Sequence, residues 1–400
     1  MARKKKTDEV VRATYTEGAA GVNNVPHTGI DSMDKERASY LLSDEIKVEL
    51  FDLQKLPNAV KNEIVLSSRE DIKNLVREYY QAQSSRIKKG AEIRSAIKNA
   101  EERGEPTPNM GATQYLYNQF AGLENEIKKA LDVWTKHDTV ASWCREVMGI
   151  GPVIAAGLVT YFDITRAPSA SHFLSYAGLN DNNDPWLGKK RSEELVKRHC
   201  KNATVTEEEL MALSMDPECP RSIEKLIKYA FDEKKGVYKR ENLINNLAKI
   251  PYNAELKTLL WKLGESFVKV SKRDGSKYGE IYRIKSAKEA KMNAEGLFAD
   301  QAATKLEKFN IGKTTDAYKA YSNGQLPKAH LHARAIRYTE KIFVCHLFEE
   351  MYRVYYNSEA PRPYPHAYLD HVDIIPPEVP YTPLDPNRPA KYPTNPVKYY

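Results

Sequence analysis

A glycine-rich turn is the stretch of this sequence whose residue types best suit a chemical task. Residues 147–162 read VMGIGPVIAAGLVTYF. Gly149 can end one helix in the left-handed conformation, Gly151 leaves the backbone bare, and Pro152 suits the first position of the next helix. The amides of Gly149, Ile150 and Gly151 would then lie beside a helix N-terminus, where phosphates bind. The turn therefore predicts a contact with a nucleic-acid backbone, and a packing turn between core helices is the alternative.

Basic residues supply further candidates for phosphate contact. Residues 257–288 hold nine Lys and Arg against three acids, and residues 187–201 hold six against two. Such local excess points to phosphate better than the net charge of +7 does. The predicted contacts are Lys189, Lys190, Arg191, Arg334, Arg337 and Lys341. The last three share one helical stripe, for which a solvated helix face is the alternative.

Residues that could form a catalytic or metal centre do not combine into one. Tyr318 and Tyr321 could act as nucleophiles, but no activating base is evident near them. The histidines and the four cysteines lack the short paired spacing of structural zinc sites. No phosphate-binding loop, dinucleotide fingerprint or nucleophile elbow is present. We predict no catalytic residue, no metal and no cofactor.

The elements that must position these residues are helical. A capping box at Ser67–Glu70 opens a helix to about Glu102, and the breaker GEPTPNMG at 104–111 ends it. A second helix follows with a near-heptad seam of Leu116, Phe120, Leu123, Ile127, Leu131 and Trp134. Residues 67–137 therefore predict an antiparallel hairpin or coiled-coil arm. Its seam packs either within the chain or against a second copy, which would make a homodimer or higher oligomer.

Further helical patterns follow the arm. Asp138 can cap a helix that ends at Gly149, Gly178 closes another, and a long helix runs from about Lys328 to Tyr356. The final forty residues hold half of the 22 prolines, which favours an extended segment. This segment wraps its own domain or a neighbour through its tyrosines, or serves as a recognition tail.

The predicted fold class is mainly α. We expect a flexible arm at 1–40, a helical hairpin or coiled-coil region at 41–137, a helix-hairpin-helix domain at 138–357 with an insertion at about 190–250, and an extended Pro/Tyr-rich tail at 358–400.

Composition limits the compartment and excludes a membrane span. Four scattered cysteines without a CxxC pair fit a reducing compartment. No apolar run approaches the ~20 residues of a membrane-spanning helix, and the N-terminus has no apolar signal core. We expect a cytoplasmic protein without a membrane partner.

The glycine-rich turn with its flanking helices is the first of three ordered pieces that resemble a known family. The pieces are GIGPVIAAGL followed by SYAGL, then NAELKTLLWKLGESF at 253–267, then the helix at 318–353. Together they resemble the C-terminal domain of IS110/IS116/IS902-family transposases. The pieces cover about half of residues 147–353. The resemblance implies a helix-hairpin-helix domain that binds DNA during transposition or recombination. RNA remains open as a ligand, since that family works with a guide RNA.

Two departures separate this chain from the family. The family begins with a RuvC-like domain whose acids hold metal, and no such acidic strand pattern precedes residue 67. The family also carries a nucleophilic serine after YAGL, where this chain has Asn182, Asn183 and Asp184. Ser192 lies further on and is interpreted as a helix cap.

Three hypotheses follow. The first is a nucleic-acid-binding protein, with DNA as the main ligand, that lacks its own catalytic centre. The second is a divergent transposase or recombinase that carries out strand transfer, and the third is an interaction protein that uses the arm and the tail.

Overall fold

The computed structural model describes residues 55–180, 186–219, 221–362 and 374–391. The predicted arm at 1–40 and the residues Asn182, Asn183 and Asp184 lie outside these ranges. The described chain is mainly helical, which confirms the predicted class, and its one sheet pairs β1 (Phe231–Asp232) with β2 (Val237–Tyr238) in antiparallel register. None of the described helices is long and apolar enough to cross a membrane.

The chain divides into two compact units. The first unit comprises the residues up to Ala170 and those from Leu259 onward. The second unit comprises Ser171–Thr258 and encloses the predicted insertion at about 190–250.

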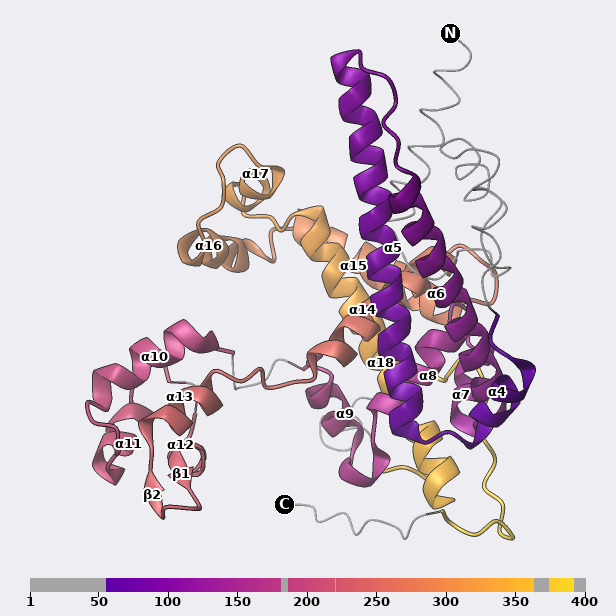
Figure 1. The fold of residues 1–400 in the computed structure, drawn as a ribbon. Coiled ribbons are helices and arrows are strands. Elements are labelled where there is room, and N and C mark those ends of the chain that lie inside the picture. The colour runs from indigo at the N-terminus through magenta and orange to yellow at the C-terminus, as the bar shows by residue number, and fades with distance from the viewer. Residues whose placement is uncertain (1–54, 181–185, 220, 363–373, 392–400) are drawn as a thin grey trace. The chain divides into compact units, whose positions relative to one another are not determined.

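The predicted hairpin is formed by two long antiparallel helices in the first unit, α5 (Arg69–Arg103) and α6 (Gly111–His137) (Figure 1). The short α4 (Asn58–Glu63) and η1 (Ile64–Leu66) precede them. The capping box uses Ser68 and Asp71, one residue later than predicted. Gly104, with a φ of 68°, ends α5 in the left-handed conformation that glycine adopts without steric cost.

The interior of the hairpin contains a buried polar network. The Glu124 carboxylate accepts hydrogen bonds from Gln83 Nε2 at 2.8 Å and from Arg86 Nε at 2.7 Å. The predicted seam is buried only at its C-terminal half, because Leu116 and Leu123 are 41% and 50% exposed. The hairpin is therefore held by polar pairing as well as by apolar contact.

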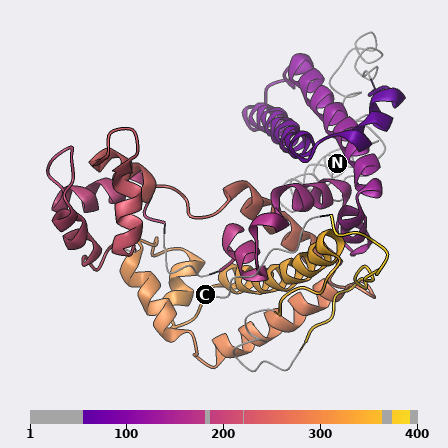
Figure 2. The same cartoon turned by 90° about the horizontal axis from the view of Figure 1, so that it is seen from below.

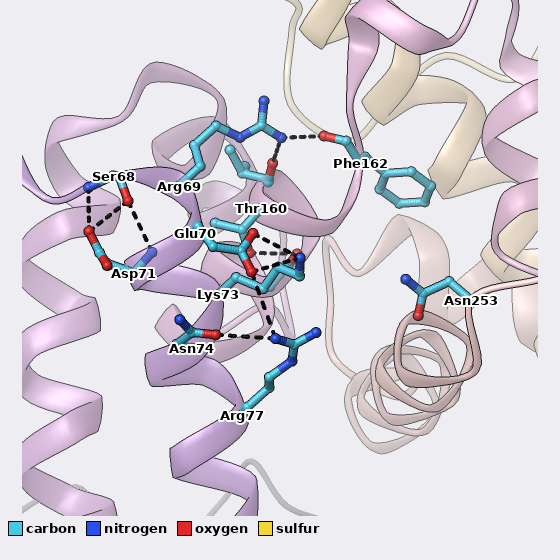
Figure 3. Close-up of polar contacts among 12 residues, drawn as sticks. Ser68, Arg69, Glu70, Asp71, Lys73, Asn74, Arg77, Thr160, Phe162 and Asn253 are labelled. Atoms are coloured by element: carbon cyan, nitrogen blue, oxygen red, sulfur yellow. Dashed lines mark hydrogen bonds and ion pairs between the residues drawn. The ribbon is translucent and has the colours of Figure 1, made fainter. Parts of the chain in front are cut away.

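The core of the first unit surrounds α8 (Pro152–Tyr161), all ten residues of which are buried. Helices α5, α6 and α7 (Thr139–Glu146) pack against α8. The Arg69 guanidinium donates to the carbonyl oxygens of Val159 and Phe162 at the C-terminal end of α8 (Figure 3). These carbonyls have no partner within the helix, so Arg69 satisfies them and fixes α8 against the hairpin.

Three longer helices complete the first unit. They are α14 (Ala254–Val270), which begins in the second unit, α15 (Lys277–Ala294) and α18 (Lys328–Tyr356). Helix α15 packs beside α18 (Figure 2). The short α16 (Ala299–Lys308) and α17 (Asp316–Ser322) lie between α15 and α18 in sequence, and η2 (Ile164–Arg166) follows α8.

The second unit has its own apolar core. It contains α9 (Ala170–Tyr176), α10 (Gly188–His199), α11 (Glu207–Ser214), α12 (Ile223–Ala230), α13 (Arg240–Leu247) and the two short strands. Leu210, Leu226 and Leu243, from three of these helices, are fully buried in one cluster.

The described part of the C-terminal tail packs on the first unit, as the wrapping hypothesis predicts. Trp143 Nε1 donates to the carbonyl oxygen of Pro380 at 3.1 Å, and the Trp143 ring stacks on Tyr381 with 6.2 Å between ring centroids. The buried Glu350 carboxylate accepts from the Thr382 amide at 2.9 Å. Polar anchors and one aromatic stack thus hold residues 380–382.

Candidate nucleic-acid interface

The glycine turn differs in one respect from its predicted form. Helix α7 is capped by Asp138 as predicted, but it ends at Glu146, three residues before Gly149. Val147–Ile150 then form a turn in which the Ile150 amide donates to the Val147 carbonyl at 3.1 Å. Gly149 is the third residue of this turn, with a φ of 98°. A positive φ at the third position favours glycine.

The predicted phosphate-binding amides have different surroundings. The Ile150 amide is used in the turn, and the Ile150 side chain is buried. Within the described ranges, the amides of Gly149 and Gly151 make no hydrogen bond. Gly151 is the N-cap of α8 and Pro152 is its first residue, as predicted. A Cβ at Gly151 would meet no atom within 4 Å, so the N-terminus of α8 faces open space at this residue.

The turn lies against the C-terminal part of α14. Ser266 Oγ donates to the Gly149 carbonyl at 2.5 Å. A Cβ at Gly149 would lie 3.2 Å from Ser266 Oγ and 3.3 Å from Val270 Cγ2. Close approach and positive φ therefore both require glycine at 149.

A basic loop lies next to the glycine turn, and its cations are not among the contacts predicted from the sequence. Residues 271–276 connect α14 to α15, and Lys272 and Arg273 in this loop are exposed. A Cβ at Gly275 would lie 3.9 Å from Met148 Cε. The charge excess over 257–288 was the available signal, but it did not single out these two cations. The structure therefore has the glycine turn next to a loop that carries an exposed guanidinium group and an exposed ammonium group.

Lys189, Lys190 and Arg191 lie in the second unit, exposed in the first turn of α10. Cations at the positive end of a helix dipole are electrostatically unfavourable, and no side chain caps this terminus. An anion bound at this terminus would offset the unfavourable electrostatic energy. Ser192 is buried inside α10 and donates to the Gly188 carbonyl at 2.8 Å, so it is neither a cap nor an available nucleophile.

The predicted stripe on α18 is only partly available. Arg334 Nε lies 2.6 Å from Glu289 Oε2, and the other oxygen of this carboxylate lies 2.7 Å from Lys285 Nζ. Glu289 is 1% exposed; burial raises the pKa of its carboxyl group, and the hydrogen bonds from Arg334 and Lys285 outweigh this and lower the pKa overall. Arg334 is thus engaged in a structural pair. Arg337 is exposed on the same helix and Lys341 is half-buried.

The histidines considered as metal ligands take part in hydrogen bonds instead. His199 Nε2 lies 2.8 Å from Asp216 Oδ2, and His332 lies between Tyr282 and Glu265. The described ranges contain no group of three or more His, Cys, Asp or Glu that could hold a metal ion. Tyr321 Oη is 3.4 Å from His330 Nδ1, a long contact for an activating base.

No protein-family model, curated protein or solved structure matches this chain. The resemblance to IS110/IS116/IS902-family transposases therefore rests on the sequence motifs alone.

Proposed function

We propose that this chain binds nucleic acid, with DNA as the main ligand, by holding the phosphate backbone at the glycine turn. One observation carries the proposal. The amides of Gly149 and Gly151 lack partners in the described structure, and the exposed cations Lys272 and Arg273 are on the adjacent loop. Amides at a helix N-terminus together with cations form a binding site for phosphate.

The glycine turn is anchored in the core of the first unit. Helix α8 is buried along its whole length, Arg69 closes its C-terminal end, and the Ile150 side chain fixes the turn in the core. Preorganised amides lose little conformational entropy on binding. Because backbone amides do not distinguish bases, the contact positions nucleic acid without reading its sequence.

The basic turn of α10 would supply a second contact, in the other unit. A phosphate at this helix end would offset the unfavourable interaction of the helix dipole with the cations Lys189, Lys190 and Arg191. The absence of a serine from the loop after YAGL and the structural role of Ser192 favour a binding protein without its own nucleophile.

The substitution Gly151→Asp tests the proposal. The N-cap φ of −93° and ψ of 175° suit aspartate, whose carboxylate can accept from the free amides of the first turn of α8. The folded state should be as stable as wild type or more so, by up to about 1 kcal/mol. The carboxylate would occupy the phosphate position, and we expect affinity for duplex DNA to fall at least about tenfold.

Gly151→Asn is the matched control, because it caps the helix without a charge and should weaken binding less. Affinity would be measured by fluorescence anisotropy in a salt titration, on DNA and on RNA of one sequence. Equal affinities for wild type and Gly151→Asp would reject the glycine turn as the binding site.

A further inference from the structure

A carboxylate from the C-terminal tail is bound by two backbone amides next to the glycine turn. Glu378 Oε1 accepts from the Met148 amide at 2.6 Å, and Glu378 Oε2 accepts from the Lys277 amide at 2.9 Å. Met148 belongs to the turn, and Lys277 is the first residue of α15. Two amides from distant segments thus converge on one anion, in the arrangement that binds phosphate oxygens.

The N-terminus of α15 also contains a buried polar group without a partner among the described residues. Ser276 is its N-cap residue and is 4% exposed, but its side chain does not cap the helix. Its buried hydroxyl has no hydrogen-bond partner in the described structure. Serine is among the preferred N-cap residues because its oxygen normally accepts from this first turn. The Glu378 carboxylate accepts from the amide of Lys277, the N1 residue, which an N-cap side chain does not reach, and the Ser276 hydroxyl is left without an acceptor within the described ranges.

The tail does not depend on Glu378 for its attachment. His346 Nε2 donates to the Ile375 carbonyl at 2.8 Å on one side of Glu378, and Trp143 holds Pro380 on the other. The Glu378 side chain is half-buried and so reachable from solvent. Rotation of this side chain away from the two amides would leave the contacts of Ile375 and Pro380 intact.

We propose that the amides of Met148 and Lys277 form an additional phosphate site, and that Glu378 is an internal competitor which a phosphate of the bound nucleic acid displaces. The proposal deepens the function proposed above and rests on it for the identity of the ligand. Lys272 and Arg273, with Asp274, are exposed on the loop that ends at Ser276 and give this loop one net positive charge. Glu378 would raise the ligand concentration needed for binding, because the ligand must replace the contacts that Glu378 already makes.

Inorganic phosphate tests the site without nucleic acid. In Glu378→Ala the amides lose their occupant, and we expect millimolar phosphate to raise the melting temperature of this variant by about 2 °C more than that of wild type. Glu280→Ala is the control, because Glu280 is an exposed acid in the first turn of the same helix. An equal phosphate response in Glu378→Ala, Glu280→Ala and wild type would overturn the proposal.

Nucleic-acid binding provides the second readout. We expect Glu378→Ala to bind duplex DNA about fivefold more tightly than wild type, the size of one net hydrogen bond, and to steepen the salt dependence by about one counterion. Glu378→Gln keeps one amide acceptor in place, so it guards against loss of folding and should give a smaller gain. If wild type binds DNA and neither variant binds it more tightly, Glu378 is not a competitor, and the proposed function stays intact. If Gly151→Asp binds DNA as tightly as wild type, the proposed function of the glycine turn is rejected. The effect of phosphate on the melting temperature of Glu378→Ala still tests the second site in that case.

Discussion

At Gly149 two independent features oppose any side chain. The φ of 98° is strained for other residues, and the Cβ contacts with Ser266 and Val270 are tighter than most real ones. We expect Gly149→Ala to lower the free energy of unfolding by about 1–3 kcal/mol. Gly151→Ala, with an ordinary φ and open space around the added methyl group, should change it by less than about 1 kcal/mol. Urea denaturation of both variants compares them, and equal losses would contradict this account of the turn.

His346 makes the stability of the tail contact depend on pH. Burial lowers the pKa of His346 to about 4, below the ordinary value of 6.5. Its Nε2–H donates to the Ile375 carbonyl, so the neutral Nδ1 accepts from Tyr278 Oη at 2.7 Å. The unfolded chain binds a proton first as pH falls, so the stability contributed by the neutral ring is full above pH 6.5 and is lost towards pH 4.

The loss should reach about 3 kcal/mol near pH 4. His346→Gln can make both hydrogen bonds without titrating, and its unfolding free energy should therefore fall less steeply between pH 6.5 and 4.5. Chemical denaturation at several pH values gives both profiles. Parallel profiles for variant and wild type would show that His346 does not carry the effect.

Among the elements, those defined by local signals were predictable and those defined by distant contacts were not. The breaker at 104–111, the Asp138 cap and the bounds of α18 depend on residues within a few positions of each other, and the structure confirms them. Spacing placed Arg334 on a basic stripe, but Glu289, 45 residues earlier and on α15, pairs with it. Glu378 meets Met148 across 230 residues, a pairing that no periodicity encodes.

The α5–α6 hairpin leaves part of its predicted seam uncovered among the described residues. Leu116 and Leu123 are seven residues apart, hence on one stripe of α6, and both are exposed. We propose that this stripe packs against a second copy of the chain, as the predicted oligomer requires. The double substitution Leu116→Glu and Leu123→Glu should convert the oligomer to a monomer in sedimentation velocity, because it places charges in the contact.

Met211→Glu is the control for that experiment. Met211 is 53% exposed on α11 of the second unit, so the variant introduces the same charge at an exposed apolar residue outside the hairpin. It should sediment as wild type does. A wild-type chain that is already monomeric at micromolar concentration would reject the stripe as an oligomer contact.

At the scale of the whole molecule, two separate units carry the proposed phosphate contacts. The first contains the glycine turn, and the second contains Lys189 and Lys190 at the start of α10. If both bind one nucleic acid, losing the second contact should release fewer counterions. We expect Lys189→Ala with Lys190→Ala to reduce the slope of log affinity against log salt by about 2, since each phosphate contact on duplex DNA contributes about 0.9.

The matched control is Lys234→Ala with Lys235→Ala, which removes two exposed lysines from the turn between β1 and β2 of the same unit. Both double variants lower the net charge equally, so a general charge effect would weaken binding equally in the two. A contact at α10 instead predicts a slope that changes only in the first. Combined with Gly151→Asp, the loss should add to that of the glycine turn, because contacts without shared partners contribute independently. An unchanged slope in the Lys189 and Lys190 variant would confine the interface to the first unit.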